Sequence, residues 1–246
     1  MNKAVFYIIL VLCGSLFSFA NACERTLRVG INELYWPPYI IHKNGVFSGM
    51  EVEAMSLLFE GSGMCSEFIV YPNSSRMLAE IKDGRVDMLF AATETEERKE
   101  YAHFSVPYRL EIMSLYMHGS MSYNEFDVKE FARKGMVFGI NSGSYYGEFI
   151  SDLKKRKLLK YVNLPNARKR FELLNMKRID FVLEDRLAGN YMISDNQYNN
   201  VVNTGVVIQS IPVRYMLSKK TVDQHVLNTI NYSIQKKRRD ILKVFN

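Results

Sequence analysis

The residues of this chain best suited to do chemistry are charged and aromatic side chains, not nucleophiles or metal ligands. Only four histidines occur in 246 residues, with no Ser/His/Asp order, no His/Cys cluster and no Gly-rich phosphate loop. Nucleophilic catalysis, zinc binding and nucleotide binding each depend on one of those patterns. The sequence therefore favours a binding protein over an enzyme, and it predicts neither a metal site nor a cofactor.

Arg98 is the first candidate among the charged side chains. It follows the segment Thr93–Glu97, and its planar guanidinium suits the geometry of a carboxylate. Taken alone, however, Arg98 is more typical of a surface arginine that pairs with Glu94 or Glu100 along a short helix.

Two turns before predicted helices carry further candidates. The segment Asn141-Ser142-Gly143-Ser144 opens a helix predicted over 144–153, so its N–H groups could receive an anion, or Ser142 or Ser144 could simply cap the helix. Asp185 opens a helix predicted over 185–193. There an acid either favours the helix dipole or meets a cationic group.

The first 22 residues have the pattern of a secretory signal peptide. A positive start at Lys3 precedes an apolar run over 4–19, and Ala20-Asn21-Ala22 provides small residues for cleavage. A membrane anchor would need about 20 apolar residues. We therefore expect cleavage after Ala22 and an exported, periplasmic chain that begins at Cys23. A lipid anchor on Cys23 is disfavoured, because an aliphatic residue is expected where Ala20 stands.

Two cysteines remain after that cleavage, Cys23 and Cys65. A pair in an oxidising compartment predicts a disulfide. The two cysteines precede strands predicted over 27–31 and 67–71. Parallel neighbours in one sheet would bring the two sulfurs together.

Charge gives no support for nucleic-acid binding. The formal charge of +6 is spread along the chain, apart from basic runs at 154–157 and 236–239. Both runs fall on predicted amphipathic helices, where basic residues are typical of a solvated face.

Strand and helix patterns alternate along the chain. Strands are predicted over 27–31, 67–71, 86–91, 136–140 and 179–183, and helices over 50–60, 77–82, 144–153, 168–175, 185–193 and 222–234. This order predicts an α/β fold with mostly parallel sheets flanked by helices.

Two longer extended runs, 111–117 and 206–217, flank the second series of elements. Such runs are what two hinge strands between lobes would look like. We therefore predict a discontinuous lobe one, 23–115 plus 210–246, and a lobe two over 116–209.

The stretch from Asp83 to Tyr108, DGRVDMLFAATETEERKEYAHFSVPY, carries three motifs in one register. They are Gly84…Asp87, Thr93…Arg98 and Phe104-Ser105…Pro107-Tyr108. In this the chain resembles the family 3 extracellular solute-binding proteins, the periplasmic receptors of polar amino-acid importers. The likeness covers nearly the whole mature chain, and it implies the two-lobed type II periplasmic-binding-protein fold.

The resemblance also implies roles for individual residues. Arg98 matches the arginine that holds a ligand carboxylate, and Asp185 the acid that meets the ammonium. The remaining matches are Trp36, which would stack on the ligand with Tyr35, Tyr39 and Tyr145 nearby, Thr93, the turn Ser142-Gly143-Ser144, and Arg76, which is about as typical of a solvated helix.

The function implied is capture of a small amino-acid-like solute by a monomer, through hinge closure, followed by delivery to the membrane permease of an ABC importer. The number of residues between Asp87 and Arg98 is smaller than in many amino-acid-binding relatives. This difference from the family pattern bears on which ligand the protein binds. Three alternatives stay open. They are a cyclohexadienyl-dehydratase-like enzyme, for which Glu94 or Glu184 could supply an acid, a ligand sensor, and an orphan receptor for a solute other than an amino acid.

Overall fold

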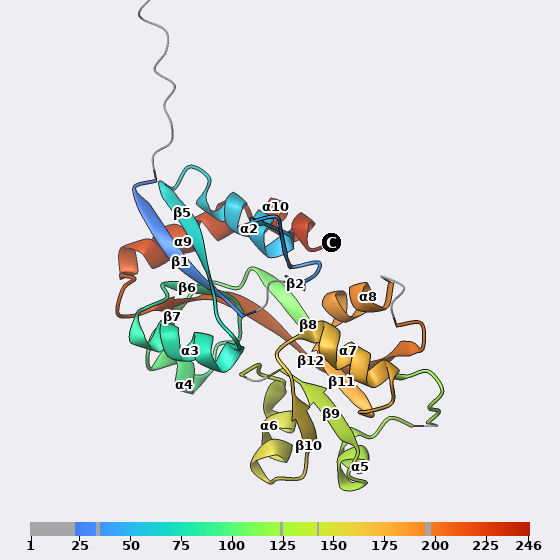
Figure 1. Ribbon diagram of the computed structural model, residues 1–246. Helices are drawn as coiled ribbons and strands as arrows, with labels where there is room; N and C mark the ends of the chain where they lie inside the picture. The colour runs from blue at the N-terminus through green and yellow to red at the C-terminus, as the bar shows by residue number, and fades with distance from the viewer. Residues whose placement is uncertain (1–22, 33–34, 124, 142, 195–197) are drawn as a thin grey trace, which may run out of the picture.

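Two long antiparallel strands, β8 (Arg109–His118) and β12 (Val201–Ser218), run through the middle of the molecule (Figure 1). The computed structural model describes residues 23–32, 35–123, 125–141, 143–194 and 198–246. The predicted signal peptide and Ser142 lie outside these residues. Both hinge strands are longer than the sequence predicts, but they cover the predicted ranges.

Parallel strands extend the sheet on both sides of this pair. The strand order is β10-β9-β11-β8-β12-β6-β1-β5, with β7 also paired to β12. The first lobe contributes β1 (Arg25–Ile31), β5 (Met64–Val70), β6 (Met88–Ala92) and β7 (Ala102–Phe104), and the second β9 (Val137–Ile140), β10 (Lys160–Asn163) and β11 (Phe181–Asp185). The predicted α/β, two-lobed architecture is thus confirmed.

Helices cover both faces of the sheet in each lobe (Figure 1). On the first lobe these are α2 (Met50–Phe59), α3 (Ser74–Asp83), α4 (Glu96–Lys99), α9 (Gln224–Lys236) and α10 (Arg238–Val244). On the second they are α5 (Val128–Arg133), α6 (Gly147–Lys155), α7 (Ala167–Asn175) and α8 (Arg186–Ser194). Apolar spacing explains their packing: α9 buries Val226, Leu227, Ile230 and Ile234 on one face.

The chain leaves the first lobe and returns to it. One core cluster draws on residues between 27 and 108 and between 213 and 245, together with Ala188, whereas another draws on residues between 113 and 183. This arrangement supports the predicted discontinuous lobe one, although the boundaries 23–115, 116–209 and 210–246 themselves stay a prediction.

Asp87 of the Gly84…Asp87 motif, and Asp180 at the equivalent place in the second lobe, hold strands in place. Asp87 accepts hydrogen bonds from the backbone N and the side chain of Arg28, at 2.7–2.9 Å. In the second lobe, Asp180 accepts one from the backbone N of Val137 at 2.7 Å. Each aspartate thereby satisfies a backbone N–H of a neighbouring strand, β1 or β9, which is a structural role.

Two local predictions differ from the structure. The helix predicted from Ser144 begins at Gly147, because the backbone at Gly143 and Gly147 is left-handed, with φ of 80° and 89°. The turn-rich segment after β1 also contains a small antiparallel sheet of β2 (Tyr35–Trp36), β3 (Ile40–Lys43) and β4 (Val46–Ser48).

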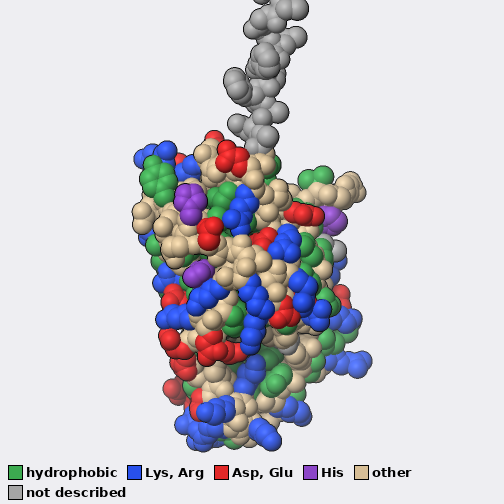
Figure 2. All heavy atoms as spheres, turned by 90° about the vertical axis from the view of Figure 1, so that its left-hand side faces the viewer, with side chains coloured by type: hydrophobic (Ala, Val, Ile, Leu, Met, Phe, Trp, Pro, Cys, Tyr) green, Lys and Arg blue, Asp and Glu red, His purple; other side chains and the backbone are tan. Residues whose placement is uncertain are grey.

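The basic runs at 154–157 and 236–239 are mostly exposed, which agrees with their interpretation as solvated helix surface. On the face in Figure 2, Lys and Arg side chains are interspersed with Asp and Glu over most of the view. Within the described residues, no helix has the length and apolar character to cross a membrane.

The predicted disulfide is confirmed. Cys23 and Cys65 are bonded with a Cα–Cα distance of 5.7 Å, beside the parallel pairing of β1 with β5. A sulfur in this disulfide is not available for a lipid thioether, so the structure argues against lipidation of Cys23.

Removing the disulfide should lower stability measurably. The bond joins residues 42 positions apart, and a closed loop of that length predicts a loss of roughly 4 kcal/mol in the double variant Cys23→Ser/Cys65→Ser. Urea unfolding of the mature protein checks this. Adding a reductant should reproduce the loss in the wild type and leave the double variant unchanged; a reductant-insensitive wild type would contradict the bond.

A buried ion pair ties β8 to α2. Glu51 and Arg109 side chains are 0% and 2% exposed, with Arg109 Nε 2.8 Å from Glu51 Oε1. The hydroxyl of Tyr108 lies within 2.9 Å of both oxygens of Glu51. The guanidinium also stacks over the ring of Tyr39 at 4.5 Å. Although burial opposes it, the Glu51 carboxylate raises the pKa of Arg109 above its ordinary value.

Glu51→Gln should destabilise the fold by about 3–5 kcal/mol, because it leaves the Arg109 charge buried without its counter-charge. Glu53→Gln in the same turn of α2 is the matched control, since Glu53 is exposed, and it should change stability by less than about 0.5 kcal/mol. Chemical unfolding measures both variants. Equal losses in their free energies of unfolding would show that the ion pair does not contribute specifically to stability.

Candidate functional site

The carboxyl ends of parallel strands from both lobes face one another. This is where ligands bind in open α/β sheets. A cavity of about 110 Å³ lies there, and because one water needs about 10–15 Å³ of such space, it has room for a small solute. Its lining includes Asn32 after β1, Thr93 after β6, Asn141 and Gly143 after β9, Glu184 in β11 and Glu111 in β8.

Arg98 lines the cavity from the first lobe; its predicted contact with a ligand carboxylate stays a prediction. Its Nη1 donates to the carbonyl of Thr93 at 2.9 Å and its Nη2 to the carbonyl of Gly143 at 3.1 Å. Within the described residues no carboxylate lies in ion-pair contact with it. Burial lowers the pKa of Arg98, yet an arginine stays protonated near neutral pH. Arg98 therefore presents an uncompensated positive charge.

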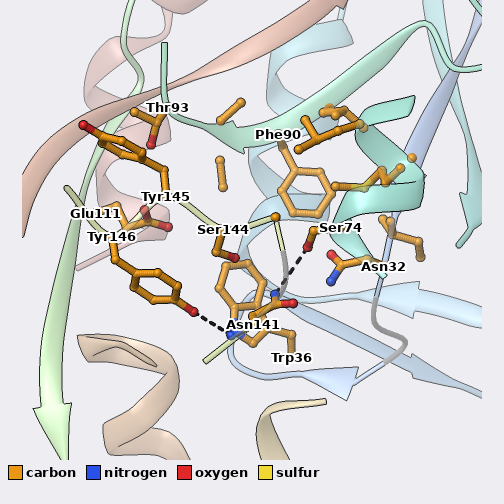
Figure 3. Close-up of a pocket in the computed structure, with 18 of the residues that line it drawn as sticks. Asn32, Trp36, Ser74, Phe90, Thr93, Glu111, Asn141, Ser144, Tyr145 and Tyr146 are labelled. Atoms are coloured by element: carbon orange, nitrogen blue, oxygen red, sulfur yellow. Dashed lines mark hydrogen bonds between the residues drawn. The ribbon is translucent and has the colours of Figure 1, made fainter. Parts of the chain in front are cut away.

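Aromatic side chains from both lobes form much of the wall (Figure 3). Trp36 lies in the lining, and its indole N–H donates to Glu184 across the cleft at 3.2 Å. Phe90 comes from β6, whereas Tyr145 and Tyr146 follow β9. Burial raises the pKa of Tyr146 to about 12, so its hydroxyl is neutral at physiological pH.

Direct contacts hold the two lobes together around the cavity. Asn141 donates to the hydroxyl of Ser74 at 3.3 Å (Figure 3), and the Tyr39 hydroxyl donates to Asp185 at 2.7 Å. A methyl group added at Gly143 would come within 2.9 Å of the backbone N of Ser75. The lobes are thus closed on one another, and the glycine lets their backbones approach.

The second-lobe turn is only partly described. Gly143 and Ser144 line the cavity, whereas Ser142 is outside the described residues. Because the following helix begins at Gly147, this turn is not a helix N-terminus.

Asp185 is beside the cavity but not in its lining. It is 2% exposed, and its Oδ1 accepts from Tyr39 and from the backbone N of Leu187 and Ala188. In this closed arrangement it anchors α8 and bridges the lobes. Its predicted contact with a ligand ammonium stays a prediction.

Arg76 and Glu94 are placed away from the cavity lining. Arg76 is on α3 with a side chain that is 57% exposed, paired with Glu80 of the same helix at 2.6 Å. This is the solvated helix arginine that the sequence left open. Glu94 pairs with Arg214 at 2.8 Å and with Lys99 at 3.2 Å.

Glu184 lines the cavity, but its charge is compensated. It forms a buried ion pair with Arg170, which also donates to the carbonyl of Pro165 at 3.0 Å. The second Glu184 oxygen accepts from Trp36 and from the backbone N of Asp185.

Glu111 is a lining residue that the sequence analysis did not single out. It is 5% exposed, and neither a hydrogen bond nor an ion pair joins its carboxyl to another described residue. Burial raises its pKa to about 8. The nearby Arg109 opposes that shift, and the acids Asp185 and Glu184 add to it. The one available signal was a charged residue inside the otherwise apolar run Leu110–Met117.

Elsewhere in the described residues, no group of three or more His, Cys, Asp and Glu side chains is arranged to hold a metal. The site therefore offers charges, hydrogen bonds and aromatic faces for binding.

The sequence profile of the bacterial extracellular solute-binding proteins, family 3, matches residues 27–243.

The chain belongs to this family. The family 3 protein is also similar to the virulence sensor protein BvgS of Bordetella pertussis, with 19% identity over 180 residues. Those residues are 73% of this chain but 14% of BvgS, so the chain corresponds to a small part of that sensor.

Solved structures share the fold of this family 3 protein. A histidine kinase sensor domain with similarity to periplasmic binding proteins gives a TM-score of 0.76 at 22% identity, over 89% of this chain and 93% of the domain. An ancestral arginine-binding protein bound to arginine gives a TM-score of 0.74 at 21% identity, over 89% of this chain and 96% of that protein. The GluR0 ligand-binding core from Nostoc punctiforme in complex with L-glutamate gives a TM-score of 0.72 at 16% identity, over 90% of this chain and 96% of that core.

The raised pKa of Glu111 should make stability depend on pH. The acid ionises near pH 4.5 when unfolded and near 8 when folded, so its stabilising protonated form is fully present below pH 4.5 and lost as pH rises to about 8. Relative to Glu111→Gln, the wild type should therefore lose on the order of several kcal/mol between pH 5 and 9. Urea unfolding of both proteins measures the difference, with Glu53→Gln as control. A difference that does not change with pH would contradict the shift.

Proposed function

We propose that this protein captures a small amino-acid-like solute in the periplasm by hinge closure and delivers it to an ABC importer. The observation that carries the proposal is Arg98, a cation without a carboxylate partner among the described residues, in the wall of a cavity closed between two lobes. Arg98 is partly buried, and a charge removed from water favours a counter-charge. A ligand carboxylate would supply one.

Closure follows from contacts that a solute makes to both lobes. Arg98 and Trp36 come from the first lobe, and Gly143, Ser144 and Tyr145 from the second. A ligand that touches both sets binds the closed state better than an open one and so shifts the population toward it. The strands β8 and β12 would absorb the rotation as hinges.

A sensor role is the second candidate. It is favoured by the likeness to BvgS and to the histidine kinase sensor domain, in which a closed lobe pair would report to a membrane partner. Gene neighbourhood separates the two: an adjacent permease and ATPase support import, whereas an adjacent kinase supports signalling.

A dehydratase-like enzyme has one favourable feature, since Glu111 is a protonated acid in the cleft at neutral pH. The binding proposal expects no loss of a cyclohexadienyl acid over a protein-free control in a spectrophotometric assay. Turnover that Glu111→Gln abolishes would instead establish catalysis.

The binding proposal predicts that at least one amino acid raises the Tm of the mature protein. A ligand at about 100 times its Kd adds roughly 2.7 kcal/mol of stability. Arg98→Lys should raise the Kd of that ligand by about thirtyfold or more, because a single ammonium does not replace the two parallel hydrogen bonds that a planar guanidinium donates to a carboxylate.

Thermal-shift titration against the twenty amino acids, small carboxylates and amines measures both effects. Arg76→Lys is the matched control and should bind like the wild type, since Arg76 is exposed and paired on α3. If no amino acid binds, or if binding is indifferent to Arg98, the proposal is wrong and a non-amino-acid solute becomes the better account.

A further inference from the structure

We propose that Glu111, on the hinge strand β8, receives the ammonium group of a zwitterionic solute whose carboxylate lies on Arg98, and that the cleft selects zwitterions with an uncharged, largely apolar side chain. The inference rests on the proposed function and deepens it. It assigns a residue outside the predicted set of ligand contacts, and it narrows the class of solute.

The position of Glu111 follows from strand geometry. Alternate residues of a strand share a face, so Arg109, Glu111, Met113 and Leu115 follow one another along one face of β8. Arg109 is bound to Glu51 in the first lobe, and Leu115 is buried in a core cluster of the second. Glu111 and Met113 fall between them, and both line the cavity. The carboxyl is therefore held where the two lobes meet.

The carboxyl of Glu111 needs a partner that the described residues do not supply. Acids are seldom fully buried unless paired, yet this one is 5% exposed and has neither an ion pair nor a hydrogen bond to any residue that the structure describes. In Figure 3 it lies on the same side of the cavity as Tyr145 and Tyr146. An ammonium group in the cavity would supply both the charge and the hydrogen-bond donors.

The other charges around the cavity are already committed. Glu184 is paired with Arg170, and Arg109 with Glu51. Asp185 is engaged by Tyr39 and two backbone N–H groups. Among the described residues that line the cavity, what remains for a solute is the cation of Arg98 and the acid of Glu111. A cation and an acid that can give up its proton match the two charged groups of a zwitterion.

The rest of the lining sets the side-chain class. Much of the remaining lining is apolar, with Ile31, Met77, Leu78, Leu89, Phe90 and Met113 among its residues. A third charge on the solute would have to be buried against this surface without a partner, which is costly. We therefore expect neutral, apolar amino acids to bind more tightly than lysine, arginine, glutamate or aspartate.

Binding should also release a proton. Several charged groups act electrostatically on Glu111. They are Arg109 on its own strand, Glu184 and Asp185 on β11, Glu51 on α2 and Arg98 from α4. The other titratable side chains in the lining are Arg170 of α7 and the neutral Tyr145 and Tyr146. Burial keeps Glu111 protonated at pH 7, and an ammonium favours its ionised form. The Kd should thus fall about tenfold between pH 6 and 7 and level off above pH 8.

Isothermal titration calorimetry with matched probes tests the proposal. The probes are L-leucine, L-methionine and L-phenylalanine, each compared with the acid that lacks its amino group: 4-methylpentanoate, 4-(methylthio)butanoate and 3-phenylpropanoate. Wild-type protein should bind at least one amino acid tenfold or more tightly than its des-amino analogue. Glu111→Gln should remove that advantage and the pH dependence, and leave the affinity for the des-amino acid within about twofold. Glu53→Gln should behave as the wild type.

The outcomes separate this inference from the proposed function. If an amino acid binds and Glu111→Gln binds it equally well, or if charged amino acids bind more tightly than the neutral probes, the role of Glu111 or the side-chain class is wrong while the receptor proposal stands. If none of the twenty amino acids binds the wild type, both fail together. An advantage that disappears in Asp185→Asn but not in Glu111→Gln would assign the ammonium to Asp185 instead.

Discussion

The pairing of β8 with β12 is the constraint on which the other features of this protein depend. Both strands pass from one lobe to the other, and their antiparallel ladder runs from Arg109 opposite Val213 to His118 opposite Val201. Every element of the second lobe lies between these strands in the sequence. The second lobe is therefore joined to the first through this pair.

One face of β8 brings this constraint to the chemistry of the cleft. At the start of β8, the Arg109–Glu51 ion pair fixes the strand to α2. Both side chains are buried, so removing either charge would be strongly destabilising. Two residues later the same face presents Glu111 to the cavity. A residue that is rigidly placed by its neighbours pays little ordering entropy when a ligand arrives. The structural ion pair and the proposed ligand contact are in this sense parts of one strand.

Features that depend on the local spacing of residues, or on the relative positions of motifs along the chain, could be predicted from the sequence. The alternation of strands and helices, the two long strands between the lobes and the Cys23–Cys65 bond were predictable. Arg98, Trp36 and Thr93 line the cavity, and their contacts with a ligand stay a prediction. The start of α6 was misplaced because two left-handed glycines delay the helix, which apolar spacing does not reveal.

What the sequence could not provide is which acid lines the cavity without a partner among the described residues. Asp185 has the expected place at the end of β11, yet its carboxylate turns to Tyr39 and to the backbone of α8. That choice depends on how the lobes meet. Glu111 is inconspicuous for the same reason: its isolation becomes visible only when the partners of every other charge around the cavity are known.

The most direct measurement is a crystal structure of the mature protein grown with the amino acid that raises its Tm most. The account predicts closed lobes, the ligand carboxylate on Arg98 and the ammonium within hydrogen-bond distance of Glu111, about 2.7–3.2 Å. An amino acid bound with its ammonium on Asp185, or one bound outside the cleft, would contradict it.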